Sequence, residues 1–280
     1  MDTIILSVIA VGIIGMLLGI LIAVAAKKFA VQLDPRIEEV AALLPGANCG
    51  GCGFAGCSDL AKNIVAGSAP IGKCPVCSAE NNEKIAGILG LTAEKKEKMV
   101  AVVLCSGSIT NSKAAAGYNG ILDCRSANIM NGGGKSCRFG CIGFGSCTRA
   151  CRFGAIEVID GLAVVHPDLC TGCGQCASVC PRKLIKLVPA SVPVHIYCNS
   201  IEKPVVRRKK CAGSCLSCRK CIKAEPEKVS SQGFMVRINY TNPPDADIIE
   251  KANCPAKCLL TPEQHLQAVQ NNAKKKEGAA

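Results

Sequence analysis

The chain has 280 residues and a formal net charge of +12 at pH 7, and it contains 22 cysteines but no tryptophan. This length allows two or three small domains, and the few aromatic residues exclude large aromatic cores, so disulfides or metal must help to stabilise the domains. No G-x-G-x-x-G follows a predicted strand, and there is no P-loop and no Ser/His/Asp grouping, which argues against a nucleotide or substrate pocket. The basic runs at 205–210 and 274–276 lack interleaved aromatic residues, so they disfavour nucleic-acid binding and fit solvated surface or the docking of an acidic electron carrier.

The N-terminal segment predicts a transmembrane anchor over residues 1–28. Residues 4–26 carry no charge, and as a helix they would be about 34 Å long, enough to cross a hydrocarbon core of about 30 Å. No basic region precedes this run and no A-x-A site closes it, so we expect a retained single-pass anchor; a buried core helix is the alternative. Lys27 and Lys28 predict that the bulk of the chain lies on the cytoplasmic side of a bacterial cell membrane, where thiols bind metal rather than form disulfides.

A first group of cysteines predicts a small 4Fe–4S domain over residues 34–91. The stretch NCGGCGFAGC contains three closely spaced cysteines, and a fourth follows after sixteen residues: Cys49, Cys52, Cys57 and Cys74. The surrounding glycines let the backbone fold tightly around a cluster and direct N–H groups at its sulfur atoms. The alternatives are a zinc site, which this spacing fits poorly, and Cys77 as the fourth ligand.

A second group predicts a two-cluster ferredoxin-like domain over residues 126–190, after a polar linker at 92–125. CTGCGQCASVCP matches the bacterial run C-x2-C-x2-C-x3-C-P, whereas the preceding CRFGCIGFGSCTRAC has Phe144 in place of the central cysteine. In such folds the fourth cysteine of each run binds the other cluster, and Cys137 can supply the missing thiolate. We therefore expect one cluster on Cys137, Cys141, Cys147 and Cys180, and its partner on Cys151, Cys170, Cys173 and Cys176. Between the runs, Asp160-Gly161 predicts a two-residue β-hairpin.

The pattern of cysteines then repeats further along the chain. Each repeated cysteine lies as many positions after its counterpart as Cys198 lies after Cys124, and we call this number of positions the repeat offset. This repeat predicts a degenerate ferredoxin-like domain over 191–261, followed by a polar tail over 262–280. Five cysteines recur, as Cys198, Cys211, Cys215, Cys221 and Cys254 for Cys124, Cys137, Cys141, Cys147 and Cys180. The four ligands of the other cluster are replaced together, by Glu225, Pro244, Asp247 and Glu250. We expect this domain to keep one cluster, on Cys215, Cys218, Cys221 and Cys254; a three-iron cluster on three of them is the alternative.

Sixteen cysteines are thus assigned to four [4Fe–4S] clusters, and six remain: Cys77, Cys105, Cys124, Cys198, Cys211 and Cys258. We expect these to be buried thiols beside the clusters; the alternative is a fifth cluster that uses Cys105, Cys124 and Cys198. None of the histidines, His166, His195 and His265, is expected to be a ligand. The predicted fold class is α+β: a single transmembrane helix, a small 4Fe–4S domain, a two-cluster ferredoxin-like domain and a one-cluster repeat of that domain.

The membrane helix, the CGGCGFAGC domain and the two cysteine runs closely resemble the B subunit of Rnf complexes, the ion-translocating ferredoxin:NAD+ oxidoreductases. The resemblance covers nearly the whole chain. It implies a cytoplasmic iron–sulfur arm that accepts electrons from reduced soluble ferredoxin and passes them towards membrane subunits. Electrons then reach NAD+ through a separate flavoprotein subunit, and Na+ or H+ moves outward. The chain alone would be an electron carrier without a catalytic residue, and the translocase would be the assembled complex.

Two other interpretations remain open from the sequence. One is an iron–sulfur subunit of a different membrane oxidoreductase, linked to a hydrogenase or to quinone, which would co-purify with a hydrogenase or molybdenum subunit. The other is a zinc-stabilised scaffold without a redox role, which would be colourless where an iron–sulfur protein is brown. A variant of the Rnf role, in which electrons keep a redox-sensing protein reduced, has the same sequence features.

Overall fold

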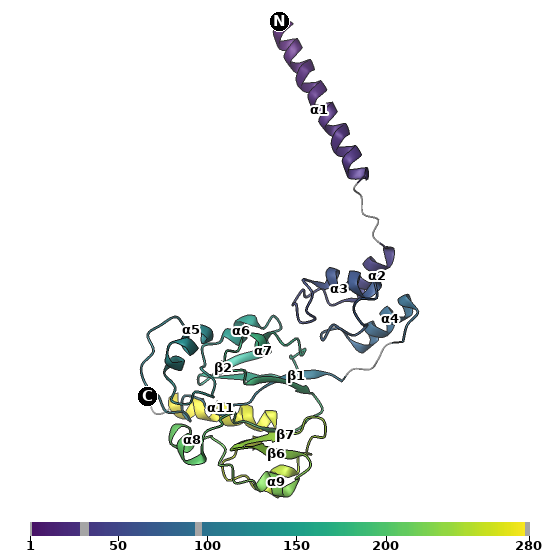
Figure 1. Ribbon diagram of the computed structural model, residues 1–280. Helices are drawn as coiled ribbons and strands as arrows, with labels where there is room; N and C mark the ends of the chain where they lie inside the picture. Colours follow the sequence, from purple (N-terminus) through teal and green to yellow (C-terminus); the bar gives the residue numbers. More distant parts are fainter. Residues whose placement is uncertain (1, 29–33, 93–96, 278–280) are drawn as a thin grey trace.

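The computed structural model describes residues 2–28, 34–92 and 97–277, and Figure 1 shows a long N-terminal helix, a small helical domain and a larger body with short strands. Helix α1 (Asp2–Lys28) is uninterrupted. Within it, residues 9–28 have a mean hydropathy of 2.8 and none of that stretch is buried inside the protein. By length and composition α1 is a candidate membrane span, because an apolar helix of this length left in water would be unfavourable.

The small helical domain consists of α2 (Pro35–Leu43), α3 (Cys57–Val65) and α4 (Ala79–Leu89). Two of the three helices have a side-chain N-cap: Asp34 accepts from the Arg36 N–H, and Ser78 accepts from the Asn81 N–H. Each helix contributes a fully buried side chain to one core, and these are Val40, Leu60 and Ile85. The core holds the loop between α2 and α3, which carries Cys49 and Cys52, and the start of α3 at Cys57 against the segment that carries Cys74.

The rest of the chain forms two ferredoxin-like modules, which we define as the first module (residues 97–190) and the second module (residues 191–261). The first contains the hairpin of β2 (Ile156–Ile159) and β3 (Leu162–Val165). Asp160 and Gly161 both have positive φ at its turn, as a two-residue hairpin requires. The second contains the matching hairpin of β6 (Val229–Gln232) and β7 (Met235–Ile238), which turns at Gly233.

Short helices complete the repeat. The first module has α6 (Ser146–Ala150) and α7 (Gln175–Val179), and the second has α9 (Lys220–Ala224) and α10 (Ile248–Ala252). Both ends of α9 lie one repeat offset after the ends of α6, so the offset seen in the cysteines is also an offset of structure.

The segment expected to be a polar linker at 92–125 instead contains a core strand. β1 (Met99–Val103) pairs antiparallel with β4 (Ile185–Pro189), and the side chains of Val100 to Leu104 are buried. The charged stretch before Met99 obscured this apolar run. In the second module the corresponding pair is β5 (His195–Ile196) with β8 (Leu259–Leu260). The first module also holds α5 (Cys124–Ile129) and the short 3₁₀ turn η1 (Asn131–Gly134), and the second holds α8 (Pro204–Lys210).

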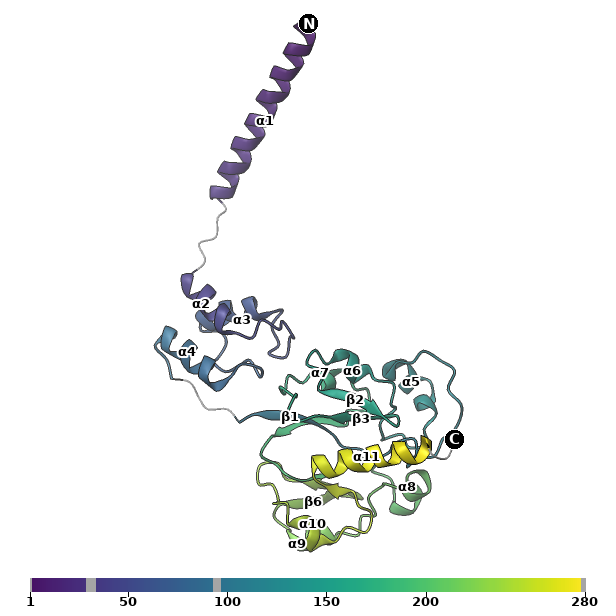
Figure 2. The same cartoon turned by 180° about the vertical axis from the view of Figure 1, so that it is seen from behind.

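The C-terminal segment expected to be a polar tail is instead helix α11 (Pro262–Glu277), which Figures 1 and 2 show running between the two modules. Its buried face consists of His265 and Val269, with Leu266 packed against the core of the first module. The His265 ring stacks on Tyr197 with centroids 3.7 Å apart. This apolar stripe is narrow and most of the remaining positions are polar, so the pattern of residues alone does not indicate a packed helix.

We expect Val269→Ala to loosen α11. The Val269 side chain is 2% exposed, so its truncation should lower the free energy of unfolding by about 1–3 kcal/mol. Hydrogen exchange of the α11 backbone amides and the thermal unfolding midpoint would measure the effect on the full chain. Gln270→Ala, at the neighbouring exposed position, should change neither quantity. Equal behaviour of the two variants would contradict the packing of α11.

Candidate metal centres

The first set of thiols lies in the small helical domain. Its loop bends through Gly46, Gly50 and Gly53, which have positive φ, and Asn48 accepts from the Cys57 N–H at 2.8 Å where α3 begins. Burial raises the pKa of Cys74, and the nearby thiols of Cys52 and Cys49 add to this. The structure therefore brings the thiols of the first predicted set into one region.

Cys77 belongs to the same region. Its pKa is raised to about 11 by burial and then by the neighbouring thiols of Cys74 and Cys57. The Cys77 backbone N–H also donates to the Cys74 sulfur, which lowers the Cys74 pKa in part. Cys77 thus lies beside the predicted ligands, and it remains the alternative fourth ligand that the sequence indicated.

The second set lines one cavity in the first module. Its four thiols belong to the residues predicted from the ferredoxin run: Cys151, Cys170, Cys173 and Cys176. The Ala101 N–H in β1 donates to the Cys170 sulfur at 3.3 Å. Burial raises the pKa of Cys176 to about 12, and the other three thiols contribute to the shift. The strand that the sequence did not reveal therefore contributes directly to this site.

The third set also lines one cavity, but its members differ from the prediction. They are Cys124, Cys141, Cys147 and Cys180, with Cys124 where the sequence indicated Cys137. Burial and then the thiols of Cys124 and Cys180 raise the pKa of Cys147 to about 12. Cys137 lies instead beside Cys105: a Cβ placed on Gly140 would be 3.5 Å from both of these sulfur atoms.

Helix α5 explains how Cys124 reaches this cavity. Asp123 caps α5 by accepting from the Arg125 and Ser126 N–H groups, and the Ser146 hydroxyl joins it to the start of α6. The hydrogen bond from Ser146, followed by the backbone N–H of Ser126, lowers the pKa of Asp123 to about 2. Phe144 indicated that a ligand must come from upstream, and the sequence led to Cys137, the nearer cysteine; the structure instead places Cys124, which the sequence left unassigned, in this cavity.

The fourth set lies in the second module. The thiols predicted there line one cavity together with a fifth: Cys215, Cys218, Cys221, Cys254 and Cys258. The Cys254 and Cys258 sulfur atoms are 3.9 Å apart. Hydrogen bonds from Cys258 lower the pKa of Cys215 to about 6 and that of Cys254 to about 5, while the pKa of Cys258 itself is raised well above its usual value. The Cys258 thiol thus donates to the sulfur atoms of Cys215 and Cys254.

The remaining thiols lie where the two modules meet. Burial and then the thiols of Cys105, Cys137 and Cys198 raise the pKa of Cys211 to about 12. Cys105 is likewise buried, which raises its pKa to about 11. The sequence left three of these four unassigned and gave Cys137 to the third set.

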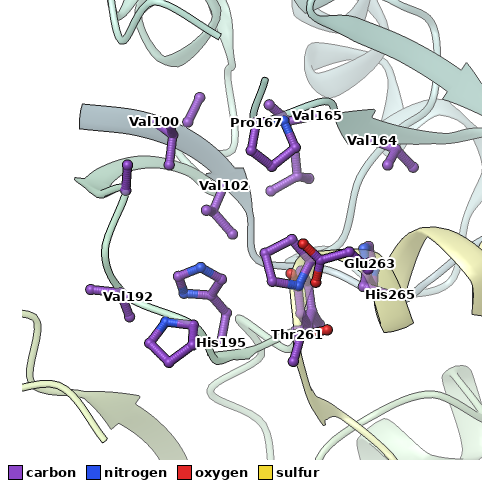
Figure 3. A pocket seen from close by; sticks show the side chains of 16 residues that line it. Val100, Val102, Val164, Val165, Pro167, Val192, His195, Thr261, Glu263 and His265 are labelled. Carbon is purple, nitrogen blue, oxygen red and sulfur yellow. The ribbon is translucent and has the colours of Figure 1, made fainter. Parts of the chain in front are cut away.

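A separate cavity of about 200 Å³ lies between β1 and the start of α11 (Figure 3), and no cysteine is among its lining residues. Two histidines, His195 and His265, border it. Burial lowers the pKa of each to about 4, so both are neutral at pH 7. His265 Nε2 donates to the carbonyl oxygen of Cys105 at 3.0 Å, and His195 contacts the Tyr240 hydroxyl. These contacts are those of core side chains.

The thiols fit iron–sulfur clusters better than single ions. Within the described residues, no three His, Cys, Asp or Glu side chains converge closely enough to hold one metal ion. The second, third and fourth sets instead surround cavities. A [4Fe–4S] cluster needs that wider spacing, because each thiolate binds a different iron at a corner of the core. Backbone N–H groups that point at ligand sulfur, as at Cys170, are the usual hydrogen bonds around such clusters.

Two family models match the chain. Residues 44–76 match a putative Fe–S cluster domain, and residues 163–186 match a 4Fe–4S binding domain. The first range includes the four predicted cysteines of the small domain, and the second includes the run from Cys170 to Cys180. The chain therefore contains iron–sulfur binding domains.

Curated relatives match most of the chain. The B subunit of the Na+-translocating ferredoxin:NAD+ oxidoreductase complex of Acetobacterium woodii is 44% identical over 77% of this chain and 65% of its own length. The B subunit of the ion-translocating oxidoreductase complex of Methanosarcina acetivorans is 38% identical over 76% of this chain and 81% of its length. The B subunit of the proton-translocating ferredoxin:NAD+ oxidoreductase complex of Clostridium ljungdahlii is 39% identical over 77% of this chain and 76% of its own length. The chain belongs to the family of Rnf B subunits.

Members of this family are iron–sulfur electron-transfer subunits of ion-translocating oxidoreductase complexes, which agrees with the interpretation of the cysteine runs. The 4Fe–4S binding model ends at residue 186, so the ligands of the second module rest on the repeat and on the cavity that their thiols line. The match spans slightly less than two thirds of the Acetobacterium protein.

We expect Cys124→Ala to remove the third set as a cluster site. Without this thiolate, the anaerobically purified full chain should contain about four iron atoms fewer than the unsubstituted chain. If the site keeps a cluster of three irons, the loss should be about one iron atom. Iron and sulfide analysis measures the loss. Arg125→Ala is the matched control, because it truncates the exposed side chain next to Cys124 and removes no thiol. An unchanged iron content in Cys124→Ala, together with a loss in Cys137→Ala from this cavity, would restore the ligand set expected from the sequence.

Proposed function

We propose that this chain relays electrons from reduced ferredoxin to the membrane subunits of an Rnf-type complex, on the way to NAD+, with coupled transport of Na+ or H+. The observation that carries the proposal is a succession of separate thiol-lined sites on one polypeptide that also has a candidate membrane span. Bound [4Fe–4S] clusters supply one-electron transfer at such sites. The names of the relatives supply the donor, the acceptor and the transported ions.

The four clusters of the proposal use sixteen thiolates. The first three sets are Cys49, Cys52, Cys57 and Cys74; Cys151, Cys170, Cys173 and Cys176; and Cys124, Cys141, Cys147 and Cys180. The fourth set is Cys215, Cys218, Cys221 and Cys254. The thiolates hold the clusters, and backbone N–H groups and burial adjust their potentials.

The first and second sets face each other across a direct contact between domains. Arg152 is next to Cys151, and its Nη1 donates to the carbonyl oxygens of Ala47 at 2.9 Å and Asn48 at 3.1 Å. A Cβ on Gly51 would lie 2.6 Å from the carbonyl oxygen of Cys173, so only glycine permits this approach. Ligand loops of two sites therefore touch, which favours electron transfer between them.

The topology of the proposal places α1 across the bilayer once and the modules on the cytoplasmic side. Lys27 and Lys28 end α1 and fit the positive-inside rule. On the modules, Arg208 and Lys209 of α8 are exposed and fit an acidic partner such as ferredoxin, whereas Arg207 in the same basic run is 1% exposed. The basic run at 205–210 is therefore only partly a solvated surface.

The purified complex tests the proposal. Mixed anaerobically with reduced ferredoxin, it should form NADH and move Na+ or H+ across a vesicle membrane, and Cys173→Ala should abolish NADH formation while the subunit stays in the complex. A colourless protein that contains zinc would overturn the proposal. So would co-purification with a hydrogenase or molybdenum subunit in place of Rnf partners.

We expect Arg152→Ala to slow electron transfer from the small domain without loss of clusters. The substitution removes both hydrogen bonds to the loop that carries Cys49, and so loosens the contact between two ligand loops. Ferredoxin-dependent NADH formation should fall several-fold at constant iron content. Arg125→Ala, which truncates an exposed arginine on α5, is the control and should leave the rate unchanged. Identical rates for the two variants would show that electrons do not pass through this contact.

A further inference from the structure

Four thiols outside the proposed relay lie together where the two ferredoxin-like modules meet, and each module contributes two of them. They are Cys105 and Cys137 from the first module and Cys198 and Cys211 from the second. We propose that these four bind a fifth [4Fe–4S] cluster, which we name the junction site. The site differs from the fifth cluster considered from the sequence, because Cys124 belongs to the third set and Cys137 and Cys211 take part.

The two cysteine pairs occupy equivalent positions in the modules. Cys105 follows β1, and its N–H donates to the carbonyl oxygen of Val103; Cys198 follows β5, and its N–H donates to that of Ile196. The residues just before these cysteines also match. The Leu104 N–H donates to the carbonyl oxygen of Leu184, and the Tyr197 N–H donates to the carbonyl oxygen of Cys258. Cys258 lies one repeat offset after Leu184, so the two acceptors are equivalent as well. Since Cys137 and Cys211 are related by the same offset, the repeat supplies the same two ligands twice.

This equivalence also explains why the sequence paired Cys124 with Cys198. Between the two cysteines of a pair, the first module has residues 106–136 and the second has only residues 199–210. The longer segment carries α5 with Cys124, so Cys124 has no structural counterpart in the second module. Its match to Cys198 by the repeat offset is a coincidence of numbering; the structural counterpart of Cys198 is Cys105.

Backbone hydrogen bonds between the modules bring the two pairs together. Lys113 N–H donates to the carbonyl oxygen of Lys210 at 2.8 Å, and Ala212 N–H donates to that of Asn111 at 2.7 Å. These bonds flank Cys211, which forms a β-bridge with Ser112. The segment after Cys105 is thus fixed against the segment around Cys211.

Two glycines leave room between the sulfur atoms. A Cβ on Gly107 would lie 3.3 Å from the Cys105 sulfur and 3.6 Å from the Cys211 sulfur. A Cβ on Gly140 would lie 3.5 Å from the sulfurs of Cys105 and Cys137. Neither glycine has positive φ, so the backbone conformation does not demand glycine at these positions. What the missing Cβ atoms provide is space next to three thiols, as a bulky inorganic core requires.

Peptide N–H groups point at the sulfurs of the junction site. The Cys105 sulfur accepts from the N–H groups of Gly107 at 3.2 Å and Cys141 at 3.3 Å. The Cys198 sulfur accepts in the same way from Ser200 and from Cys215, which lies one repeat offset after Cys141. Cys137 accepts from Phe139 and Gly140. Such bonds stabilise ligand thiolates.

Positive charge surrounds the same place. Arg182 Nη1 donates to the carbonyl oxygens of Cys137 and Gly140, and Lys135 Nζ donates to that of Gly107. A cluster with four thiolates carries a net charge of about 2−, which these cations would offset. Within the described residues, the buried hydroxyl of Ser112 and the Nε of buried Arg207 have no hydrogen-bond partner. A Cβ on Gly107 would be 3.9 Å from the Ser112 Cβ, so that hydroxyl lies close enough to serve a cluster sulfide.

The position assigns the junction site a role between the third and fourth sets. Cys141, whose N–H donates to Cys105, is a ligand of the third set, and Cys215, whose N–H donates to Cys198, is a ligand of the fourth. The cluster would take one electron from one neighbour and give it to the other, with no net chemical change. It would connect the module that retains two clusters with the module that retains one.

Iron and sulfide analysis of the full-length holoprotein, purified anaerobically, tests the junction site. With it the chain should hold about twenty iron atoms, against about sixteen without it. Cys105→Ala and Cys211→Ala should each lose up to four iron atoms, and the double variant should lose no more than four, because both thiolates serve one cluster. Gly107→Val retains every thiol but fills the space between two of them, so it should lose the same iron. Lys209→Ala, which truncates an exposed side chain two residues before Cys211, is the control and should lose none.

Mass spectrometry after alkylation supplies a second readout. In the native holoprotein the four junction thiols should resist alkylation until iron is removed, whereas disulfides among them would resist it permanently. Sixteen iron atoms in the wild type, or additive losses in the double variant, would overturn the junction site and leave buried thiols at the junction. Twelve or fewer iron atoms in the wild type would count against the relay itself, so the two proposals can fail separately.

Discussion

The domains that follow α1 depend on one electrostatic constraint: sulfur atoms that are buried in protein carry negative charge only where N–H groups or cations compensate it. Burial, reinforced by neighbouring thiols, raises the pKa of Cys147 and Cys176 to about 12. A metal that binds such thiols displaces their protons, and N–H donors of the polypeptide then stabilise the buried thiolates. The short loops with positive φ, the ends of the strands and the cations beside them are arranged in ways that meet this need.

The same constraint gives the outer strands their importance. β1 contributes the Ala101 N–H to Cys170, and the turn that follows β1 delivers Cys105 next to the Cys141 N–H. Helix α11 secures the far side of this turn, because His265 donates to the Cys105 carbonyl and stacks on Tyr197. Burial keeps His265 neutral at pH 7, so it adds a hydrogen bond without a charge that would alter a nearby cluster. Segments that the sequence indicated as linker and tail thus complete the environment of the thiols.

Sequence reasoning indicated which thiols share a cavity where the cysteines are close together in the chain. The run from Cys170 to Cys180, the hairpin at Asp160-Gly161 and the family all follow from short patterns with one structural meaning. Sequence reasoning did not place Cys124 in the cavity of the third set, because this cysteine comes from a distant segment and Cys137 lies closer to Phe144 in the chain. It also failed for β1 and α11, because their buried residues are few and lie beside charged stretches, so only tertiary packing reveals them.

The second module shows how a ferredoxin-like fold tolerates the loss of one cluster site. Glu225, at the position of Cys151, forms an ion pair with Lys228, and Asp247, at the position of Cys173, pairs with Lys251. Such pairs near the surface contribute about 0–1 kcal/mol each, too little to replace a metal cluster. The larger compensation is apolar: Val229 stands where the first module has Ala155, and Ile248 stands where it has Gly174, and both are fully buried. Full burial of such a side chain contributes about 1.5–3 kcal/mol relative to leaving it exposed. Val229 and Ile248 belong to the same buried cluster as Cys215 and Cys258, so the apolar side chains that stand at these positions pack into the core that also holds the remaining thiols.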